Sequence, residues 1–210
     1  MSLINNARCA AEGIRGDFPR AIEYALESIA LGRKALNQPS LVTAYLNLAE
    51  LYALTGDTEK ETGAFDSAEA LLSKGQTWWT RVDFALHSAS SALIHGNIPL
   101  ALEYVCEAEK LASGRECAVQ DAGVLQKFRA FRALHERGAE EALSIAHEAM
   151  GWFRGRNNLY YYTALVVSAW AERLMAGDYS VETAEELRSF DYRPIRGRKA
   201  LFAAQGFLTS

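Results

Sequence analysis

Cysteine is scarce in this chain of 210 residues, and its three copies, Cys9, Cys106 and Cys117, stand far apart. So few and such scattered cysteines exclude a disulfide framework, and no Cys-x-x-Cys pair is present for zinc or redox chemistry. We interpret all three as reduced thiols in the core or on the surface.

A long apolar run is also missing. No stretch approaches the roughly 18 uninterrupted apolar residues that indicate a membrane-spanning helix. The first residues, Met1 to Asn6, lack the basic region, apolar run and small-residue cleavage site of a secretory signal. We therefore expect a soluble, cytoplasmic protein with no membrane partner.

Positive charge is not in excess, because 22 Lys and Arg residues face 26 Asp and Glu residues, a formal net charge of −4. The sequence pI is about 5.6. Such a chain has no overall basic field to attract nucleic acid or an anionic membrane. Its charge balance argues against nucleic acid as the partner.

Motifs for catalysis and cofactor binding are absent as well. No Gly-x-x-x-x-Gly-Lys-Ser/Thr occurs, and no Gly-x-Gly-x-x-Gly follows a strand pattern, so nucleotide phosphates have no cradle. The short glycine-rich stretch at residues 151–156 is predicted to be a linker between helices. Cys106 or Cys117 could serve as a nucleophile only with a remote histidine, and plain packing is favoured. The four histidines show no metal-ligand spacing; they are His87, His95, His135 and His147. We predict no enzyme activity, no cofactor and no metal.

A repeated turn is what the chain does contain. Its glycines are Gly16, Gly56, Gly96, Gly138 and Gly177, at intervals of 40, 40, 42 and 39 residues. Each is flanked on both sides by a segment with apolar residues at helical spacing. A glycine just past a helix can adopt the left-handed conformation that ends it, and a following Asp or Asn can cap the next helix. Each unit is therefore predicted to be a helix, a tight turn and a second helix.

The prolines agree with these units. Pro19 and Pro99 each follow their turn glycine by three residues, in the first turn of the second helix, where a missing N–H costs little. Pro39 precedes Ser40, which is predicted to cap the next helix. Pro194 falls in a polar stretch after the fifth unit. No proline is expected to interrupt a helix.

This pattern resembles the tetratricopeptide repeat, whose first helix carries an aromatic residue, Leu, a small residue and Tyr before Gly-Asp, and whose second helix carries Ala, an aromatic residue and Ala. The second unit matches best, through Tyr45, Leu48, Ala49, Tyr52, Gly56, Asp57, Phe65 and Ala68. Two residues depart from the pattern, since Glu61 and Trp170 stand where small residues are usual. The period also exceeds the family's ~34 residues. Longer units of this kind are similar to the sensor arrays of bacterial multi-domain regulators, to the peptide-receiving domains of Gram-positive quorum regulators and to kinesin light chains. HEAT repeats share a ~40-residue period but lack the Gly-Asp turn.

The resemblance implies one all-α domain over residues 1–210, a right-handed superhelix (α-solenoid) of five antiparallel helix-turn-helix repeats. The repeats are expected at about residues 3–37, 40–75, 79–114, 118–154 and 158–190. Residues 191–210 would form a C-terminal capping helix or a partial sixth repeat, because an open solenoid end needs its apolar face covered. An exposed end could also support a homodimer.

The function that the resemblance implies is a non-catalytic protein- or peptide-binding scaffold, either alone or as the sensor segment of a larger regulator. In this family the first helices line a concave groove that receives peptides. The polar residues expected to face that groove are Asn47, Glu50, Asp83, His87, Ser90, Arg129 and Arg132. Arg129 and Arg132 share a helix face and could grip a carboxylate or phosphate. The alternative, which we favour, is that both are solvated or paired with Glu136 or Glu141.

The co-chaperone branch of the family binds carboxyl-terminal peptides through Lys and Asn. Its groove positions correspond here to Asn6, Leu46, Asn47 and Leu86, without lysines, so that version is disfavoured. A peptide would more readily anchor through mixed apolar and acidic residues.

Two other functions stay open. One is a peptide-responsive regulator with phosphatase activity, although quorum-sensing phosphatases carry an extra amino-terminal bundle and the first repeat here begins almost at Met1. The other is binding of single-stranded RNA through Arg154, Arg156 and the run Tyr160 to Tyr162. Consecutive residues on a helix point in different directions, so helix packing is the favoured role of these tyrosines.

Overall fold

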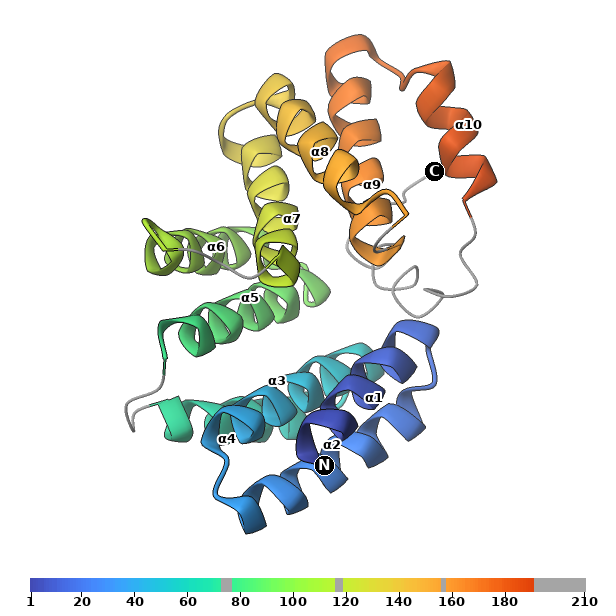
Figure 1. Cartoon of the computed structure of the whole chain (residues 1–210). Coiled ribbons are helices and arrows are strands. Elements are labelled where there is room, and N and C mark those ends of the chain that lie inside the picture. Colours follow the sequence, from blue (N-terminus) through green and yellow to red (C-terminus); the bar gives the residue numbers. More distant parts are fainter. Residues whose placement is uncertain (73–76, 116–118, 156–157, 191–210) are drawn as a thin grey trace. The chain divides into compact units, whose positions relative to one another are not determined.

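The computed structural model describes residues 1–72, 77–115, 119–155 and 158–190, and its regular structure within those ranges is entirely helical (Figure 1). The helices in these ranges are α1 (Ser2–Arg15), α2 (Phe18–Ala35), α3 (Gln38–Thr55), α4 (Thr58–Leu72), α5 (Trp78–Ile94), α6 (Ile98–Ala112), α7 (Val119–Glu136), α8 (Ala139–Phe153), α9 (Asn158–Ala176) and α10 (Val181–Ser189). They confirm the predicted all-helical class and the predicted helix pairs. Residues 191–210, with Pro194 and the expected capping helix, lie outside the described residues.

The turn glycines join the helices as the sequence predicts. The five glycines at positions 16, 56, 96, 138 and 177 all have positive φ, between 73° and 109°. After three of them the chain bonds back to the preceding helix: Asp17 N–H donates to Glu12 C=O at 3.0 Å, Asp57 N–H to Tyr52 C=O at 2.9 Å, and Asn97 N–H to Ala92 C=O at 2.8 Å. These bonds satisfy carbonyls at the helix end, so the turn stops one helix and starts the next.

The starts of α2 and α6 also follow the prediction, whereas α8 begins after Gly138 without a side-chain cap and α10 is capped by Ser180. The side chains of Asp17 and Asn97 cap α2 and α6, and Pro19 and Pro99 lie in the first turn of those helices. The prediction for the start of α3 was wrong in its cap. Asn37 caps this helix by accepting from Ser40 N–H at 3.2 Å. Pro39 therefore lies inside the first turn, and Ser40 is buried.

The contacts divide the chain into two compact units, and the first contains α1 to α6. Within it α1 packs on α3 and α3 on α5, so the first helices of successive pairs are neighbours. Each second helix packs on its own first helix through small residues, of which Ala21, Ala68 and Ala101 have no exposed surface. α2 also packs closely on α3, whereas α4 touches α5 at only a few positions.

The second unit contains α7 to α10. α8 packs on both α7 and α9, α7 also contacts α9, and α10 packs on α9. Ala142 and Ala146 of α8 have no exposed surface, in agreement with the small residues expected in a second helix. Trp170, the bulky departure from the repeat pattern, packs beside Ala142 and Ala171 and lies edge-on to the His135 ring, with centroids 6.4 Å apart.

The end of α8 corrects one prediction. Residues 151–153 of the glycine-rich stretch are helical and belong to α8, so only the residues after Phe153 can form a linker. Gly151 sits within the helix with φ in the ordinary range. Across the described parts of the chain, the helices are too short or too polar to cross a membrane.

Candidate functional site

Five of the predicted site residues lie on two neighbouring helices of the first unit. Asn47 and Glu50 belong to α3, and Asp83, His87 and Ser90 belong to α5, which packs on α3. Glu50 and Ser90 are buried, at 9% and 6% exposure, and the other three side chains are half-buried. Their side chains are less open to a partner than those of a wide groove would be.

His87 is the electrostatic centre of this group. Its ring Nδ1 lies 3.4 Å from the Asp83 carboxylate and 3.0 Å from the Asp83 backbone oxygen. Burial by itself lowers the pKa of His87, but the negative charges of Asp83 and Glu50 outweigh it and raise that pKa to about 9. The imidazole is therefore positively charged at neutral pH.

The group as a whole carries net negative charge, since two carboxylates surround one imidazolium. Such a site favours a partner that brings basic or hydrogen-bond-donating groups over one that brings carboxylates. That preference runs against the acidic anchors expected from the sequence. We call these five residues, 47, 50, 83, 87 and 90, the first-helix site.

Three of the four positions that correspond to the Lys and Asn positions of co-chaperones are buried in this chain, and Asn47 is half-buried. Leu46 and Leu86 are 0% and 2% exposed, and Asn6 is 6% exposed. The Asn6 amide group donates to the Ser40 backbone oxygen at 3.1 Å. The two leucines offer no hydrogen-bond donor to a peptide carboxylate, and the Asn6 amide group is already engaged.

The two candidate arginines lie in the second unit, on α7. Arg132 Nε is 2.5 Å from Glu136 Oε2, so this arginine has the partner that the favoured alternative assigned to it. Arg129 donates to Gln126 Oε1 at 3.4 Å. Both side chains are half-buried and already engaged within the unit. They are less suited to grip a free anion than the spacing alone indicated.

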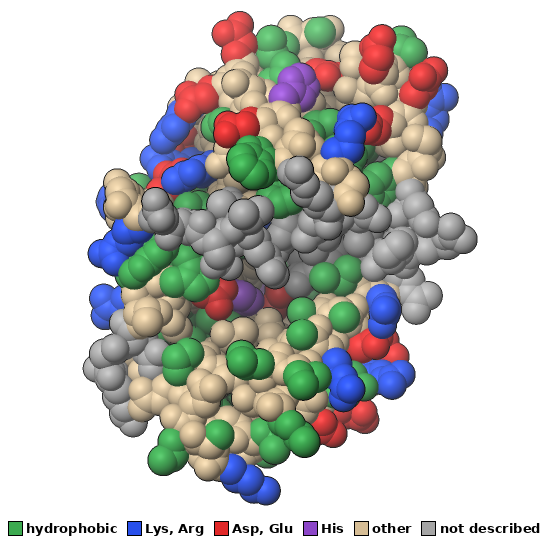
Figure 2. Space-filling model, in the orientation of Figure 1, with side chains coloured by type: hydrophobic (Ala, Val, Ile, Leu, Met, Phe, Trp, Pro, Cys, Tyr) green, Lys and Arg blue, Asp and Glu red, His purple; other side chains and the backbone are tan. Residues whose placement is uncertain are grey.

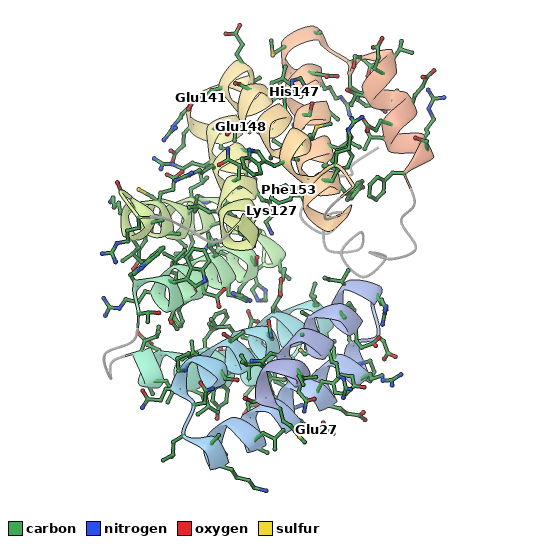
Figure 3. The ribbon with its side chains drawn as sticks, viewed as in Figure 1. Glu27, Lys127, Glu141, His147, Glu148 and Phe153 are labelled. Carbon is green, nitrogen blue, oxygen red and sulfur yellow. The ribbon has the colours of Figure 1, made fainter. Side chains whose placement is uncertain are left out.

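Acidic residues of α8 lie along α7 as well. Glu148 accepts from Gln126 at 3.4 Å, and Glu141 pairs with Arg137 at 2.7 Å (Figure 3). Figure 2 shows that positive and negative side chains are interspersed on the face in view. This mixture offers no basic stripe for a nucleic acid backbone.

Two of the three tyrosines of the RNA-binding alternative are part of the core, and the side chain of Tyr160 lies outside the described residues. Tyr161 and Tyr162 of α9 are 6% and 0% exposed. The Tyr161 hydroxyl contacts Glu186 of α10 and accepts from Arg154 at 2.7 Å. Burial and the Glu186 hydrogen bond raise the pKa of Tyr161 to about 12. Buried rings cannot present a stacking platform to bases, and Arg156 lies outside the described residues.

A second group of polar side chains was missed as a site by the sequence analysis. Glu61 of α4 is only 4% exposed and accepts a hydrogen bond from Ser91 Oγ of α5, while His95 Nε2 lies 2.8 Å from Glu61 Oε2. The one signal was the departure at Glu61 itself, a carboxylate where the repeat pattern places a small residue.

This group does not resemble a hydrolytic triad. The Glu61 carboxylate stands between Ser91 and His95, whereas nucleophilic catalysis needs the base beside the hydroxyl. Cys106 lies half-buried on α6, as its packing role predicts. Among the residues that the structure describes, no three His, Cys, Asp or Glu side chains are grouped to hold a metal ion.

The comparisons with known proteins yield no relative. No protein-family model, curated protein or solved structure matches this chain.

Proposed function

We propose that this chain is a non-catalytic protein- or peptide-binding scaffold of the tetratricopeptide type, with successive helix pairs arranged as a right-handed superhelix within each unit. The first-helix site is its binding surface. One observation carries the proposal: first helices pack side by side, α3 on α5, and both bring polar side chains to the same place. Neighbouring helices that each contribute alternate polar groups suit an extended segment of another protein.

The charge of the first-helix site supports a partner with basic or amide groups. His87 holds Asp83 in place, and Glu50 lies close enough to affect the charge of His87. A pre-arranged network of this kind binds with little loss of side-chain entropy, because its members are already ordered. The scaffold would serve alone or as the sensor segment of a larger cytoplasmic regulator.

The test uses peptides selected from a random display library on the immobilised full chain, with affinity measured by fluorescence anisotropy. Asn47→Ala and Asp83→Ala should each weaken the selected peptides about tenfold. Glu23→Ala and Glu107→Ala, at exposed positions of the second helices α2 and α6, are the matched controls and should leave affinity unchanged. Unchanged affinity in Asn47→Ala and Asp83→Ala, with loss of affinity in the control variants, would show that the first-helix site is not the binding surface.

The second unit has its own test. Arg129→Ala and Arg132→Ala should change peptide affinity little, because Arg132 is paired with Glu136 and Arg129 with Gln126. A large loss for either variant, with the fold intact by circular dichroism, would place the binding surface on α7 instead.

A further inference from the structure

A cavity of about 520 Å³ lies in the first unit, on a different side of α5 from the first-helix site. Its walls come from α4, α5 and the start of α6. The α5 residues that line it are Phe84, Ser88, Ser91 and Ala92, and His95 follows directly after the helix. Positions 84, 88, 91 and 95 recur every three or four residues and so share one helix face. The volume falls in the range of small-molecule sites, roughly 300–1,000 Å³.

The cavity occupies a seam where the repeat packing is sparse. α2 packs closely on α3 and α8 on α9, but α4 touches α5 at only a few positions. The same seam holds Glu61, whereas the equivalent position four residues after the helix cap is Ala21, Ala101 or Ala142 in three other pairs, each with no exposed surface. A carboxylate thus replaces the packing residue at a seam that opens into a cavity.

Negative charge is in excess over positive charge among the described residues that line this cavity. Glu61 and Glu69 line it, and none of its described lining residues is Lys or Arg. His95, 41% exposed, supplies at most one positive charge. Keeping a carboxylate out of water costs several kcal/mol unless a counter-charge and hydrogen bonds offset it. Ser91 and His95 each engage one Glu61 oxygen, and a carboxylate can accept about four hydrogen bonds in all. Capacity therefore remains for a further donor.

The rest of the lining is aromatic and apolar. Phe65 of α4 and Phe84 of α5 meet edge to face with ring centroids 5.8 Å apart, and Tyr104 of α6 adds a third ring. Aromatic faces attract cations, and apolar walls accept a hydrocarbon body. A ligand that suits both parts is amphipathic, with a positive end at Glu61 and an apolar body along the rings.

We propose that this cavity binds an organic ammonium or guanidinium group carried on an apolar body. The group would donate to Glu61 and lie among the three aromatic rings. An anion would meet two carboxylates, and a neutral ligand would bring no positive charge to Glu61 beyond what His95 can supply. The same chemistry could come from a free amine or from a Lys or Arg side chain of a bound peptide, and the two sources are separated by experiment.

The experiment is calorimetric titration of the full chain with phenethylamine, its neutral isostere phenethyl alcohol, and phenylacetate. Phenethylamine should bind with a Kd below about 1 mM, the alcohol at least about tenfold more weakly, and phenylacetate not measurably. Glu61→Gln should weaken phenethylamine about tenfold and leave the alcohol unchanged. Glu107→Gln, an exposed carboxylate of α6 outside the cavity, is the matched control and should bind as the native chain does.

Equal binding of amine and alcohol, no binding of the amine, or an unchanged amine affinity in Glu61→Gln would each overturn the proposal. Glu61→Ala repeats the test with the residue that three other pairs carry at this position. Because alanine packs there in those pairs, this variant is expected to fold, and a loss of binding then reports on the carboxylate. The blocked tripeptide Phe-Lys-Phe, with Phe-norleucine-Phe as its control, distinguishes the source. A lysine peptide that binds tighter than phenethylamine, and needs its ammonium group, assigns the cavity to a protein partner. A lysine peptide that binds more weakly than phenethylamine assigns the cavity to a free amine.

Discussion

Glu61 Oε2 lies 2.8 Å from His95 Nε2, and this contact joins α4 to α5 across the seam that contains the cavity. The two residues are 34 positions apart, and Glu61 occupies a place that is alanine in three other helix pairs. A buried carboxylate in a packing position contributes little to stability when its partners are neutral or half-exposed. Its presence is better explained by binding than by folding.

Replacing Glu61 by alanine should therefore not unfold the chain. We expect the free energy of unfolding of Glu61→Ala to be unchanged, or raised by up to about 1 kcal/mol, because desolvation of the carboxylate is removed and His95 can turn to solvent. Urea denaturation followed by circular dichroism measures this. The reciprocal control is Ala101→Glu, which buries a carboxylate at the equivalent position of α6 and should cost about 3 kcal/mol or more. A comparable loss of unfolding free energy in Glu61→Ala would show that Glu61 stabilises the fold.

The stability of the first unit should depend on pH through His87. Its pKa is about 9 in the folded chain against an ordinary value of 6.5, so the protonated form favours the fold. The contribution is fully present below about pH 6.5 and is lost as the pH rises through 9. We expect a loss of about 1–3 kcal/mol over that interval, since the ring is 19% exposed and solvent screens part of the effect.

Urea denaturation at several pH values tests the role of His87. His87→Gln should be less stable than the native chain near pH 6 and about as stable above pH 9.5. His147→Gln, which removes an exposed histidine of the other unit, should keep the native pH dependence. A native chain whose stability is flat from pH 6 to pH 9.5 would contradict the assigned charge of His87.

Local signals explain why the helix pairs could be predicted from sequence. A left-handed glycine, a capping Asp or Asn and a proline in the first turn all act within a few residues, as at Gly16, Asp17 and Pro19. The wrong cap at α3 shows the limit of such reasoning. Both Asn37 and Ser40 can cap a helix, but Ser40 donates its hydroxyl to Ser2 and its N–H to Asn37. The contact with Ser2 spans 38 residues, so the local sequence does not reveal it.

The sites depend on tertiary packing and were only partly predictable. Helical spacing placed Asp83 and His87 on one face, but their burial and the effect of Glu50 follow from α5 packing on α3. The link between Glu61 and His95 has no periodic pattern to reveal it. Only the break in the repeat at Glu61 marked the position, without indicating its partners.

The turn between α2 and α3 is strained at Leu36. This residue has φ of 52°, the left-handed conformation that a side chain disfavours, and it is 86% exposed. Leu36→Gly should raise the free energy of unfolding by about 1 kcal/mol, because the steric cost disappears and no packing is lost. Thermal unfolding measures the gain. Leu36→Ala keeps the β-carbon and should show almost none of it, and a gain equal to that of glycine would refute the explanation.

The contact between α7 and α8 depends on the absence of a side chain at Gly123. A β-carbon there would lie 2.0 Å from Cζ of Phe153, whose position at the end of α8 is marked in Figure 3. Gly123→Ala should therefore destabilise the second unit by about 1–3 kcal/mol, although alanine is the better helix former. Gly151→Ala is the control within the same unit, because its β-carbon would meet nothing within 4 Å. It should stabilise by about 0.5–1 kcal/mol.

Phe153→Leu separates the clash from any other effect at Gly123. The shorter side chain gives room to a β-carbon, so Gly123→Ala should cost less in the Phe153→Leu background than in the native chain. The coupling between the two substitutions, obtained from urea denaturation of the four proteins, should be about 1 kcal/mol or more. Purely additive effects would mean that Phe153 can move aside, and the close approach of α7 and α8 would then not depend on glycine.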